Sequence, residues 1–363
     1  MGETYLKQAI TKPVSKDGKG PLVLFGASTV QGWRNTQEDA HICQPQLDGT
    51  ASLWGVFDGH NGAEVAQFAA KRLPKILLSN KNYREGKYEL ALQESFQAMD
   101  DLLLARDSIK ELISLRQAYS KAPITRQNAP AIASGCTAVV ALVKNGTAYV
   151  ANLGDSRCIL ARNGKAYPLS EDHKPDSDTE KARIEAAGGE VVSGRINYGV
   201  NVSRALGDHL YKRNPNIGKK EQMIIAWPDV KTEKLNPKTD PFMVLICDGI
   251  WNCVPNHDLI AYVNKRITKV RPLSKICEQI FNQIIPKVMP KRGIIGKDNM
   301  TILIVKFEGG AEAQGAKAVK KIRSKESVFI PNHTSSIKKP GAPPGAYSPS
   351  GGAPPASEPP APQ

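Results

Sequence analysis

The chain has 363 residues, of which 40% are hydrophobic, 23% are charged and only 6% are aromatic, and its formal net charge is +14. This composition can supply the core of one large domain or of two. The charge does not indicate nucleic-acid binding, because no compact run of Lys and Arg is interleaved with aromatic residues that could stack on bases. A basic surface of this kind favours anionic substrates instead.

Composition divides the chain into three expected segments. Residues 1–21 form a polar, lysine-containing N-terminal extension, and residues 22–310 carry the apolar runs of a folded domain. Residues 311–363 contain ten of the 26 prolines. Because this tail cannot bury enough apolar surface to offset the entropy of ordering, we expect it to be mostly disordered, with 317–330 as a stretch that could form a short helix.

Within the folded segment, strand-like and helix-like runs follow each other in blocks. Strands are predicted at 22–30, 51–57, 137–144, 147–153, 157–161, 242–247 and 301–307. Helices are predicted at 62–79, 88–119, 179–190 and 274–288. Asn145-Gly146 between two strands indicates a tight hairpin. Together these elements predict an α+β domain with mostly antiparallel sheets covered by helices.

Two apolar runs stop at an Asp-Gly pair, at Asp58-Gly59 and at Asp248-Gly249. Taken alone, either pair is more typical of a hairpin turn. However, each is followed by a helix-like segment, the second with Asn256 as a candidate helix cap, and not by a second strand. We therefore expect both carboxylates to stand at the C-terminal rim of buried strands.

Two further acids join them: a third apolar run ends at Gly154-Asp155, and Asp298 stands just ahead of a fourth strand-like run. Unpaired carboxylates at the ends of core strands are costly to desolvate, so they need cations or arginines beside them. The chain has no CxxC or HExxH pattern and no cluster of histidines. Oxygen ligands therefore favour Mg²⁺ or Mn²⁺ over zinc.

Eight motifs carry a resemblance to a known family. They are GWRNTQEDAH (32–41), FDGHNG (57–62), SGCTA (134–138), NLGDSR (152–157), EDHKP (171–175), VSRALGD (202–208), CDGIWN (247–252) and KDNMT (297–301). In this order they resemble the type 2C metal-dependent serine/threonine protein phosphatases, the PPM family. The resemblance implies a four-layer α-β-β-α sandwich with a dinuclear metal centre at one end, and phosphorylated proteins as substrates.

The resemblance also assigns roles to residues. It implies that Asp58 bridges two Mn²⁺ or Mg²⁺ ions, with Glu38 and the Gly59 carbonyl on one ion and Asp248 and Asp298 on the other. A hydroxide held between the ions would attack phosphorus in line, without a covalent phosphoenzyme.

Further family roles fall on residues around these ligands. Arg34 matches the phosphate-binding arginine, His60 the proposed general acid, and Asp39 an acid that contacts metal-bound water. The family's weak third metal site would involve Asp155 and Asp248. Asn252 stands where many relatives have Asp, so we expect that third site to be weaker here.

For several other residues in these motifs a structural role is considered alongside a functional one. For Arg157 and Arg204 we favour ion pairs with acids, and His173 could fix the start of a loop region at 175–225 that the family uses as a variable flap. Ser134 and Thr137 are expected in a core strand, with no histidine or lysine nearby in sequence to activate them.

Two other functions remain open at this point. A pseudophosphatase would keep the fold as a binding module, but intact Glu38, Asp58, Asp248 and Asp298 speak against it. A scaffold recruited through the proline-rich tail to SH3- or WW-type partners is compatible with catalysis.

The N-terminus and the cysteines bear on location. Gly2 follows Met1 as in N-myristoylated relatives, but Leu6 stands where the acylation pattern prefers Ser or Thr, so acylation is left open. Six cysteines lie mostly in or beside apolar runs and indicate a reducing compartment. We expect a cytoplasmic monomer, with the nucleus or a membrane surface as alternative locations.

Overall fold

The computed structural model describes residues 5–120, 124–125, 128–236, 238–290, 293 and 295–308. Gly2, the expected helix at 317–330 and the tail from 311 onward lie outside the described residues. No helix within these ranges is long and apolar enough to cross a membrane.

A six-stranded antiparallel sheet forms one half of a β-sandwich. Its strands, in spatial order, are β1 (Val14–Gly20), β2 (Val23–Val30), β16 (Met300–Phe307), β15 (Phe242–Ile246), β9 (Arg157–Arg162) and β10 (Lys165–Pro168). The central strand β15 is buried throughout, whereas β1 is an exposed edge.

A five-stranded antiparallel sheet forms the other half. Its order is β14 (Asp229–Lys234), β8 (Thr147–Leu153), β7 (Ala138–Lys144), β4 (Ala51–Phe57) and β3 (Ala40–Asp48). The predicted hairpin joins β7 to β8, and Asn145 and Gly146 both have positive φ, of 51° and 73°, as a two-residue type I′ turn requires. The inner faces of the two sheets meet in one core, in which the rings of Phe25 and Trp54 have centroids 5.2 Å apart.

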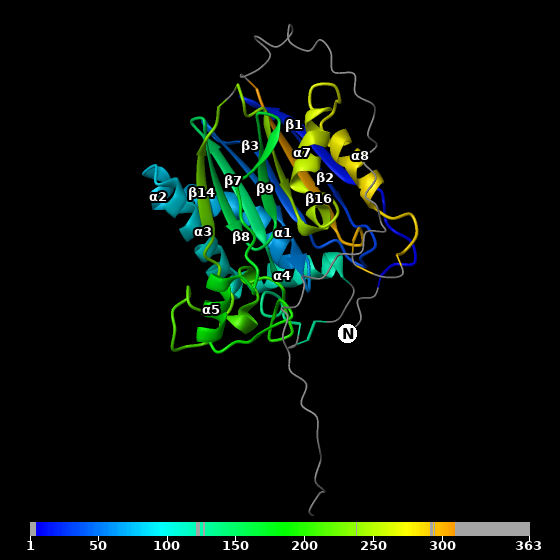
Figure 1. Ribbon diagram of the computed structural model, residues 1–363. Coiled ribbons are helices and arrows are strands. Elements are labelled where there is room, and N and C mark those ends of the chain that lie inside the picture. Colours follow the sequence, from blue (N-terminus) through cyan, green and yellow to red (C-terminus); the bar gives the residue numbers. More distant parts are fainter. Residues whose placement is uncertain are drawn as a thin grey trace, which may run out of the picture. The chain divides into compact units, whose positions relative to one another are not determined.

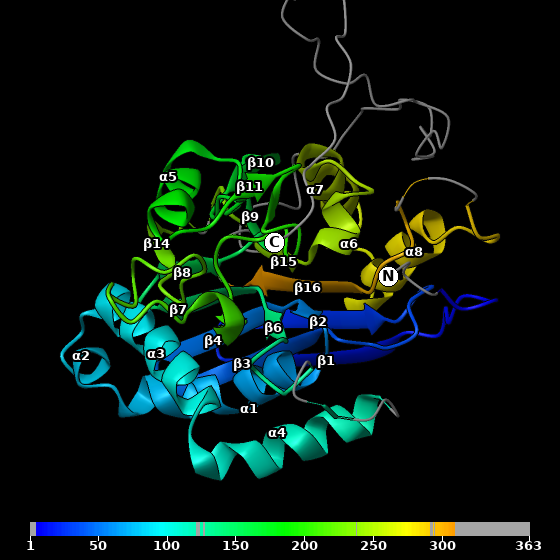
Figure 2. The ribbon, with the colours of Figure 1, turned by 90° about the horizontal axis from the view of Figure 1, so that it is seen from below.

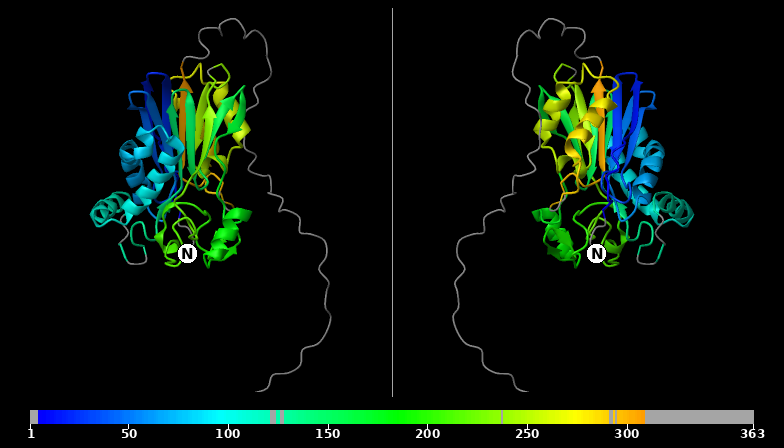
Figure 3. Two further views of the ribbon diagram at one scale, coloured as in Figure 1. Left: turned by 90° about the vertical axis from the view of Figure 1, so that its left-hand side faces the viewer. Right: turned by 90° about the vertical axis from the view of Figure 1, so that its right-hand side faces the viewer.

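Helices cover both outer faces, so the domain has four layers (Figure 3). α1 (Glu64–Ser79) and α3 (Tyr88–Leu103) pack on the five-stranded sheet, with the short α2 (Lys81–Arg84) between them in sequence. α7 (Asn256–Asn264) and α8 (Ser274–Ile284) pack on the six-stranded sheet (Figure 1). The α+β class and the α-β-β-α sandwich are both confirmed.

Short elements gather at one end of the sandwich. β5 (Gly59–His60), β6 (Gly135–Cys136) and β13 (Leu206–Gly207) form a three-stranded sheet there. The segment 175–225 contains α5 (Asp178–Ala186), the hairpin of β11 (Val191–Val192) and β12 (Arg195–Ile196), and a 3₁₀ turn at His209–Tyr211. After α5, Gly188 has φ of 88°, which is the left-handed conformation expected just beyond a helix end.

The helix predicted at 88–119 is wrong as a single element. It is two helices, α3 and α4 (Arg106–Tyr119), because Ala105 is extended with φ −67° and ψ 137°. No Gly or Pro marks this break. The break at Ala105 changes the direction of the chain, so α4 is not collinear with α3 and packs against α1 instead (Figure 2). Packing between helices, rather than local propensity, sets the boundary.

Three other expectations differ from the structure. Strand β1 lies within the expected N-terminal extension; it pairs with β2 mainly through its backbone, and its polar, mostly exposed residues show no strand pattern. Gly59 and His60 pair with β6, so a short strand does follow Asp58 before the helix begins at Glu64. Asn256 is the first residue of α7 and makes no capping hydrogen bond; its side-chain oxygen accepts from Arg157 Nη1 at 3.3 Å.

Candidate active site

Four strand-end acids meet at one end of the sandwich. Asp58 follows β4 and Asp155 follows β8 after one residue, whereas Asp298 stands just before β16. Asp248 begins a one-turn helix, α6 (Asp248–Trp251), directly after β15 and Cys247. Neighbouring antiparallel strands alternate in direction, so strand ends and strand starts share this rim.

Burial and neighbouring negative charge both act on the pKa values of Asp58 and Asp248. Burial, followed by the charges of Asp39, Asp248, Asp298 and Asp155, raises the pKa of Asp58 well above its usual range. Burial, followed by the charges of Asp155 and Asp298, raises the pKa of Asp248 to about 8, against the opposing effects of a hydrogen bond with Asp58 and the charge of Lys174. Such a cluster is stable in its ionised form only with cations among the carboxylates.

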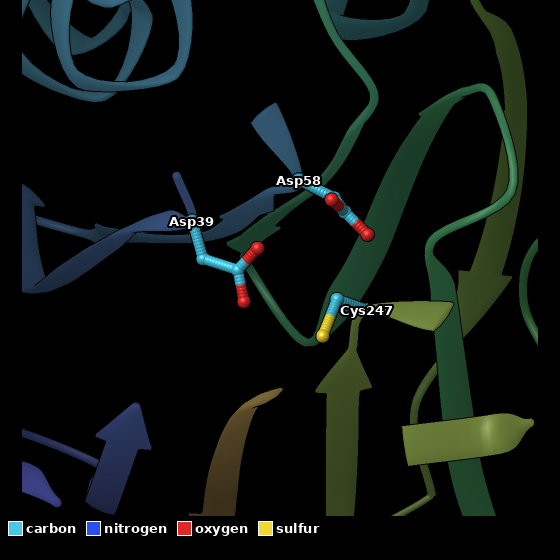
Figure 4. Close-up of side chains that lie close together, drawn as sticks. All are labelled: Asp39, Asp58 and Cys247. Carbon is cyan, nitrogen blue, oxygen red and sulfur yellow. The ribbon is translucent and has the colours of Figure 1, made fainter. Parts of the chain in front are cut away.

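Asp39, Asp58 and Cys247 bring one potential ligand atom each within 4.8 Å of one another (Figure 4). Cys247 Sγ accepts a hydrogen bond from Thr301 N at 3.2 Å, and burial, followed by the charges of Asp39 and Asp58, raises the pKa of its thiol well above the usual range. The thiol is therefore protonated. Since metals bind the thiolate, the carboxylates are the better ligands.

Asp39 is buried and only partly satisfied. Its Oδ2 accepts from Thr301 Oγ1 at 2.6 Å, whereas Oδ1 has no hydrogen-bond partner among the described residues. Burial, with the charges of Asp298 and Glu38, raises its pKa to about 7. A buried carboxylate oxygen without a donor fits a hard cation or its bound water in this site.

Glu38 reaches the rim from the segment before β3. Its backbone N donates to Asn299 Oδ1 at 2.9 Å. Its two carboxylate oxygens accept from Thr36 Oγ1 at 2.8 Å and from Gly62 N at 3.0 Å. A Cβ on Gly59 would lie 2.4 Å from the Glu38 carbonyl oxygen, so only glycine lets these two segments approach.

Asn299 was not singled out from the sequence. Besides accepting from Glu38, its side-chain amide donates to the carbonyls of Gln31 and Thr36 at 2.9 and 3.0 Å. It therefore ties the segment before β3 to the start of β16. The only sequence signal was its place in the KDNMT motif.

Arg34 lies beside one of the acids. Its Nη2 donates to Asp298 Oδ2 at 2.8 Å, and its side chain is 35% exposed. The guanidinium group is thus held at the mouth of the acidic cluster with part of its surface open to solvent. A planar fork in this position suits a phosphoryl group.

His60 has a partner that sequence reasoning missed. Its Nε2 lies 2.5 Å from Oδ2 of Asp208, a buried residue in the left-handed conformation (φ 51°). Burial alone would lower the pKa of His60, but the charge and hydrogen bond of Asp208 outweigh it and raise the pKa above its usual range. The pairing with Asp208 therefore favours the protonated imidazole, the form that can donate a proton.

The residues of the expected third metal site also lie together. Lys174 Nζ donates to Asp155 Oδ2, and Trp251 Nε1 donates to the Asp155 carbonyl at 2.8 Å. Asn252 Nδ2 donates to Asp248 Oδ2 at 3.2 Å. A lysine ammonium beside Asp155 and an amide beside Asp248 both reduce the negative charge available to a further cation.

Arg157, Arg204 and His173 make the kind of structural contacts expected for them from the sequence. Arg157 makes a two-armed ion pair with Asp172, with both distances 2.9 Å. Arg204 pairs with Glu180 and Asp229. His173 Nδ1 accepts from Gly154 N at 3.1 Å, so its Nε2 donates to Asp229 at 3.0 Å. All three side chains are therefore paired with acids other than the four strand-end acids Asp58, Asp155, Asp248 and Asp298.

The two hydroxyl residues of SGCTA are buried, but they flank the short strand β6 instead of lying within a strand as expected. Ser134 Oγ donates to Glu64 Oε1, and Thr137 Oγ1 shares a hydrogen bond with Ser156 at 2.8 Å. Neither contact activates a nucleophile, because no base accepts the Thr137 proton and the partner of Ser134 is a buried carboxylate paired with Arg116.

The acidic end of the sandwich could hold cations, and comparisons with known proteins identify the family. The family profile "Protein phosphatase 2C" matches residues 23–288. "Probable protein phosphatase 2C 4" of Paramecium tetraurelia is 43% identical over 310 residues, covering 84% of this chain and 99% of that relative. "Probable protein phosphatase 2C 21" of Arabidopsis thaliana is 37% identical over 334 residues, covering 84% and 92%.

Solved structures share the fold. The serine-threonine phosphatase 2C from Toxoplasma gondii matches with a TM-score of 0.63 at 20% identity, covering 84% of this chain and 99% of that one. On the sequence relationships, the chain belongs to the protein phosphatase 2C family and is a metal-dependent protein phosphatase.

Proposed function

We propose that the acidic end of the sandwich binds two divalent cations, Mn²⁺ or Mg²⁺, and hydrolyses phosphoserine and phosphothreonine in proteins. The observation that carries this proposal is the meeting of five acids, Asp39, Asp58, Asp155, Asp248 and Asp298, at one buried end of the sandwich, where burial and their charges raise the pKa values of Asp58 and Asp248. Glu38, Asp58, Asp248 and Asp298, with the Gly59 carbonyl, would hold the two ions. Bound divalent cations supply charge neutralisation, activation of water near neutral pH and stabilisation of a phosphoryl group under attack.

The other residues act on the substrate. Arg34 would bind the phosphoryl oxygens through the exposed part of its guanidinium group. A serine or threonine alkoxide is a poor leaving group, so protonation by His60 would contribute about 10²–10⁴-fold in rate. Since Nε2 faces Asp208, the proton would leave from Nδ1, and Asp208 would stabilise the charged ring before the transfer.

The test is phosphate release from phosphoserine, phosphothreonine and phosphotyrosine peptides with added Mn²⁺ or Mg²⁺. Activity should require the cation, disappear with chelator and favour the serine and threonine peptides. Asp58→Ala and Asp248→Ala should lower turnover by orders of magnitude while circular dichroism shows a folded protein. Turnover at the wild-type rate without metal in either variant would refute the dinuclear site.

The same site argues against a pseudophosphatase. Glu38, Asp58, Asp248 and Asp298 are all present, and Glu38 and Asp298 are oriented by hydrogen bonds from backbone or side-chain donors. A binding module without chemistry would need none of these contacts.

Two proposals concern residues outside the described ranges. The proline-rich tail would recruit SH3- or WW-type partners, which a pull-down with the tail alone tests. Acylation of Gly2 would place part of the protein at membranes, with the remainder cytoplasmic or nuclear; mass spectrometry of the N-terminal peptide, compared with Gly2→Ala, tests it.

A further inference from the structure

A buried arginine on α4 contacts the loop that carries His60. Arg116 lies in the last turn of α4, and its side chain is 6% exposed. Its Nη2 donates to the Asn61 carbonyl at 2.8 Å and to Glu64 Oε1 at 2.6 Å, and its Nη1 donates to the Asn128 carbonyl. One guanidinium group thus joins the Asn61 carbonyl, the first turn of α1 and the segment before β6.

A second set of contacts runs from Glu64 to Asp208. Ser134 Oγ donates to Glu64 Oε1 and accepts from Ala131 N at 3.0 Å. The Ser134 carbonyl accepts from Asp208 N at 2.9 Å. Ser134 therefore holds the backbone of Asp208, whose side chain pairs with His60; Ser134 in turn contacts Glu64, and Glu64 contacts Arg116.

Close packing leaves this arrangement little freedom. A Cβ on Gly135 would lie 2.3 Å from Asp208 Oδ2 and 2.8 Å from His60 Nε2. A Cβ on Gly62 would lie 2.3 Å from Glu64 Oε2 and 2.5 Å from Arg116 Nη2. The glycines therefore let the two polar pairs approach the backbone, and the Arg116 side chain lies directly against the loop at 61–62.

The loop also bears on the acidic site, because Gly62 N donates to Glu38 Oε2 at 3.0 Å. Buried ion pairs contribute little net stability when they are compared with apolar replacements, but they do define geometry. The Arg116–Glu64 pair, with Glu64 fully buried, lies where both segments that hold the His60 ring meet.

The geometry points to Arg116 as a positioning residue for His60: through Asn61 and through Glu64, Ser134 and Asp208, it sets the ring in the orientation that donates a proton to the leaving group. This inference rests on the proton-donor role of His60 proposed above. Nothing in the contacts places Arg116 on substrate, and we assign its effect to the ring rather than to Glu38, which the same loop also contacts.

The test compares kcat on a phosphothreonine peptide with kcat on an aryl phosphate, whose phenolate leaves without a proton donor. Arg116→Gln should lower kcat for the peptide by about tenfold or more and for the aryl phosphate by less than about twofold, with KM little changed. Arg116→Lys should recover part of the loss because its ammonium can still pair with Glu64. In a His60→Gln background, Arg116→Gln should cause no additional loss.

Two controls separate positioning from stability. Arg162→Gln removes a partly buried two-armed pair with Asp240 at the other end of β9, and it should leave the ratio of the two kcat values unchanged. The double variant Glu64→Gln/Arg116→Met removes the buried charges together, so it should stay folded in a thermal melt and still show the selective loss.

The outcomes are distinguishable. If His60→Gln is selective for the peptide but folded Arg116 variants are not, the positioning inference is wrong and the proposed function stands. If Arg116→Gln adds its full loss in the His60→Gln background, Arg116 acts independently of the ring and the inference is again wrong. If His60→Gln affects both substrates equally, the proton-donor role fails, and the inference fails with it.

Discussion

Replacement of Asp39 by asparagine tests the cation site without measuring turnover. Asp39 is 3% exposed, and its pKa is raised from 3.8 to about 7 by burial and by the charges of Asp298 and Glu38, against the hydrogen bond from Thr301. Asparagine has nearly the same shape and still offers an oxygen to Thr301. The substitution therefore removes the charge and little else.

The sign of the effect follows from proton linkage. An acid whose pKa is raised by folding binds its proton more tightly in the folded state, so the metal-free protein loses stability as pH rises from the unfolded pKa through the folded one. For Asp39 this window runs from about 4 to about 7. Each pKa unit corresponds to about 1.4 kcal/mol, so the ionised carboxylate costs on the order of 4 kcal/mol above this window.

The assay is urea unfolding in chelator at pH 5 and at pH 8. The wild type should be less stable at pH 8 than at pH 5, and Asp39→Asn should reduce that difference by a few kcal/mol. Part of this pH-dependent difference in stability should remain in the variant, because the pKa values of Asp58 and Asp248 are raised as well. With saturating Mn²⁺ the wild type should regain more stability than the variant. If both proteins show the same pH dependence of stability, the ionised Asp39 side chain does not destabilise the metal-free protein and this reasoning is wrong.

Three further predictions concern the third cation, the acid stability and the tail. Asn252→Asp would place a second charge beside Asp248, so a Mg²⁺ titration of kcat should show activation at lower concentrations than in wild type; superimposable curves would remove this position from the third site. Against the effect of burial, hydrogen bonds from Lys144 and Tyr83 hold the pKa of Asp48 below its usual range. Asp48 therefore stabilises the protein above about pH 4 and loses this effect as pH falls, so Asp48→Asn should unfold with a shallower acid dependence in thermal melts, and an unchanged slope would contradict the pairing. Truncation after residue 312 should leave the melting temperature and peptide turnover unchanged, and a loss of either would show that the tail docks on the domain.

The sequence by itself determined the local features that depend on neighbouring residues. Buried strands appear as apolar runs, so the positions of Asp58 and Asp248 at the ends of β4 and β15 could be predicted from the order of residues alone. Asn145-Gly146 specifies its hairpin because both residues tolerate positive φ. Aspartates at the strand ends, in a chain without Cys or His metal-binding motifs, indicate hard cations, because the type of ligand residue determines which metals are preferred.

Only the tertiary structure decided which distant residues meet. His60 and Asp208 are 148 positions apart, and no periodicity relates them; the pairing of β5 with β6 and of β6 with β13 brings them together. The same holds for Asn299, whose side chain accepts a hydrogen bond from the Glu38 backbone. It also holds for Arg116, which reaches Glu64 because the chain breaks between α3 and α4 at a point that no Gly or Pro predicts. Residue patterns record whether a side chain faces a core, but the partners inside that core are set by sheet register and helix packing over the whole chain.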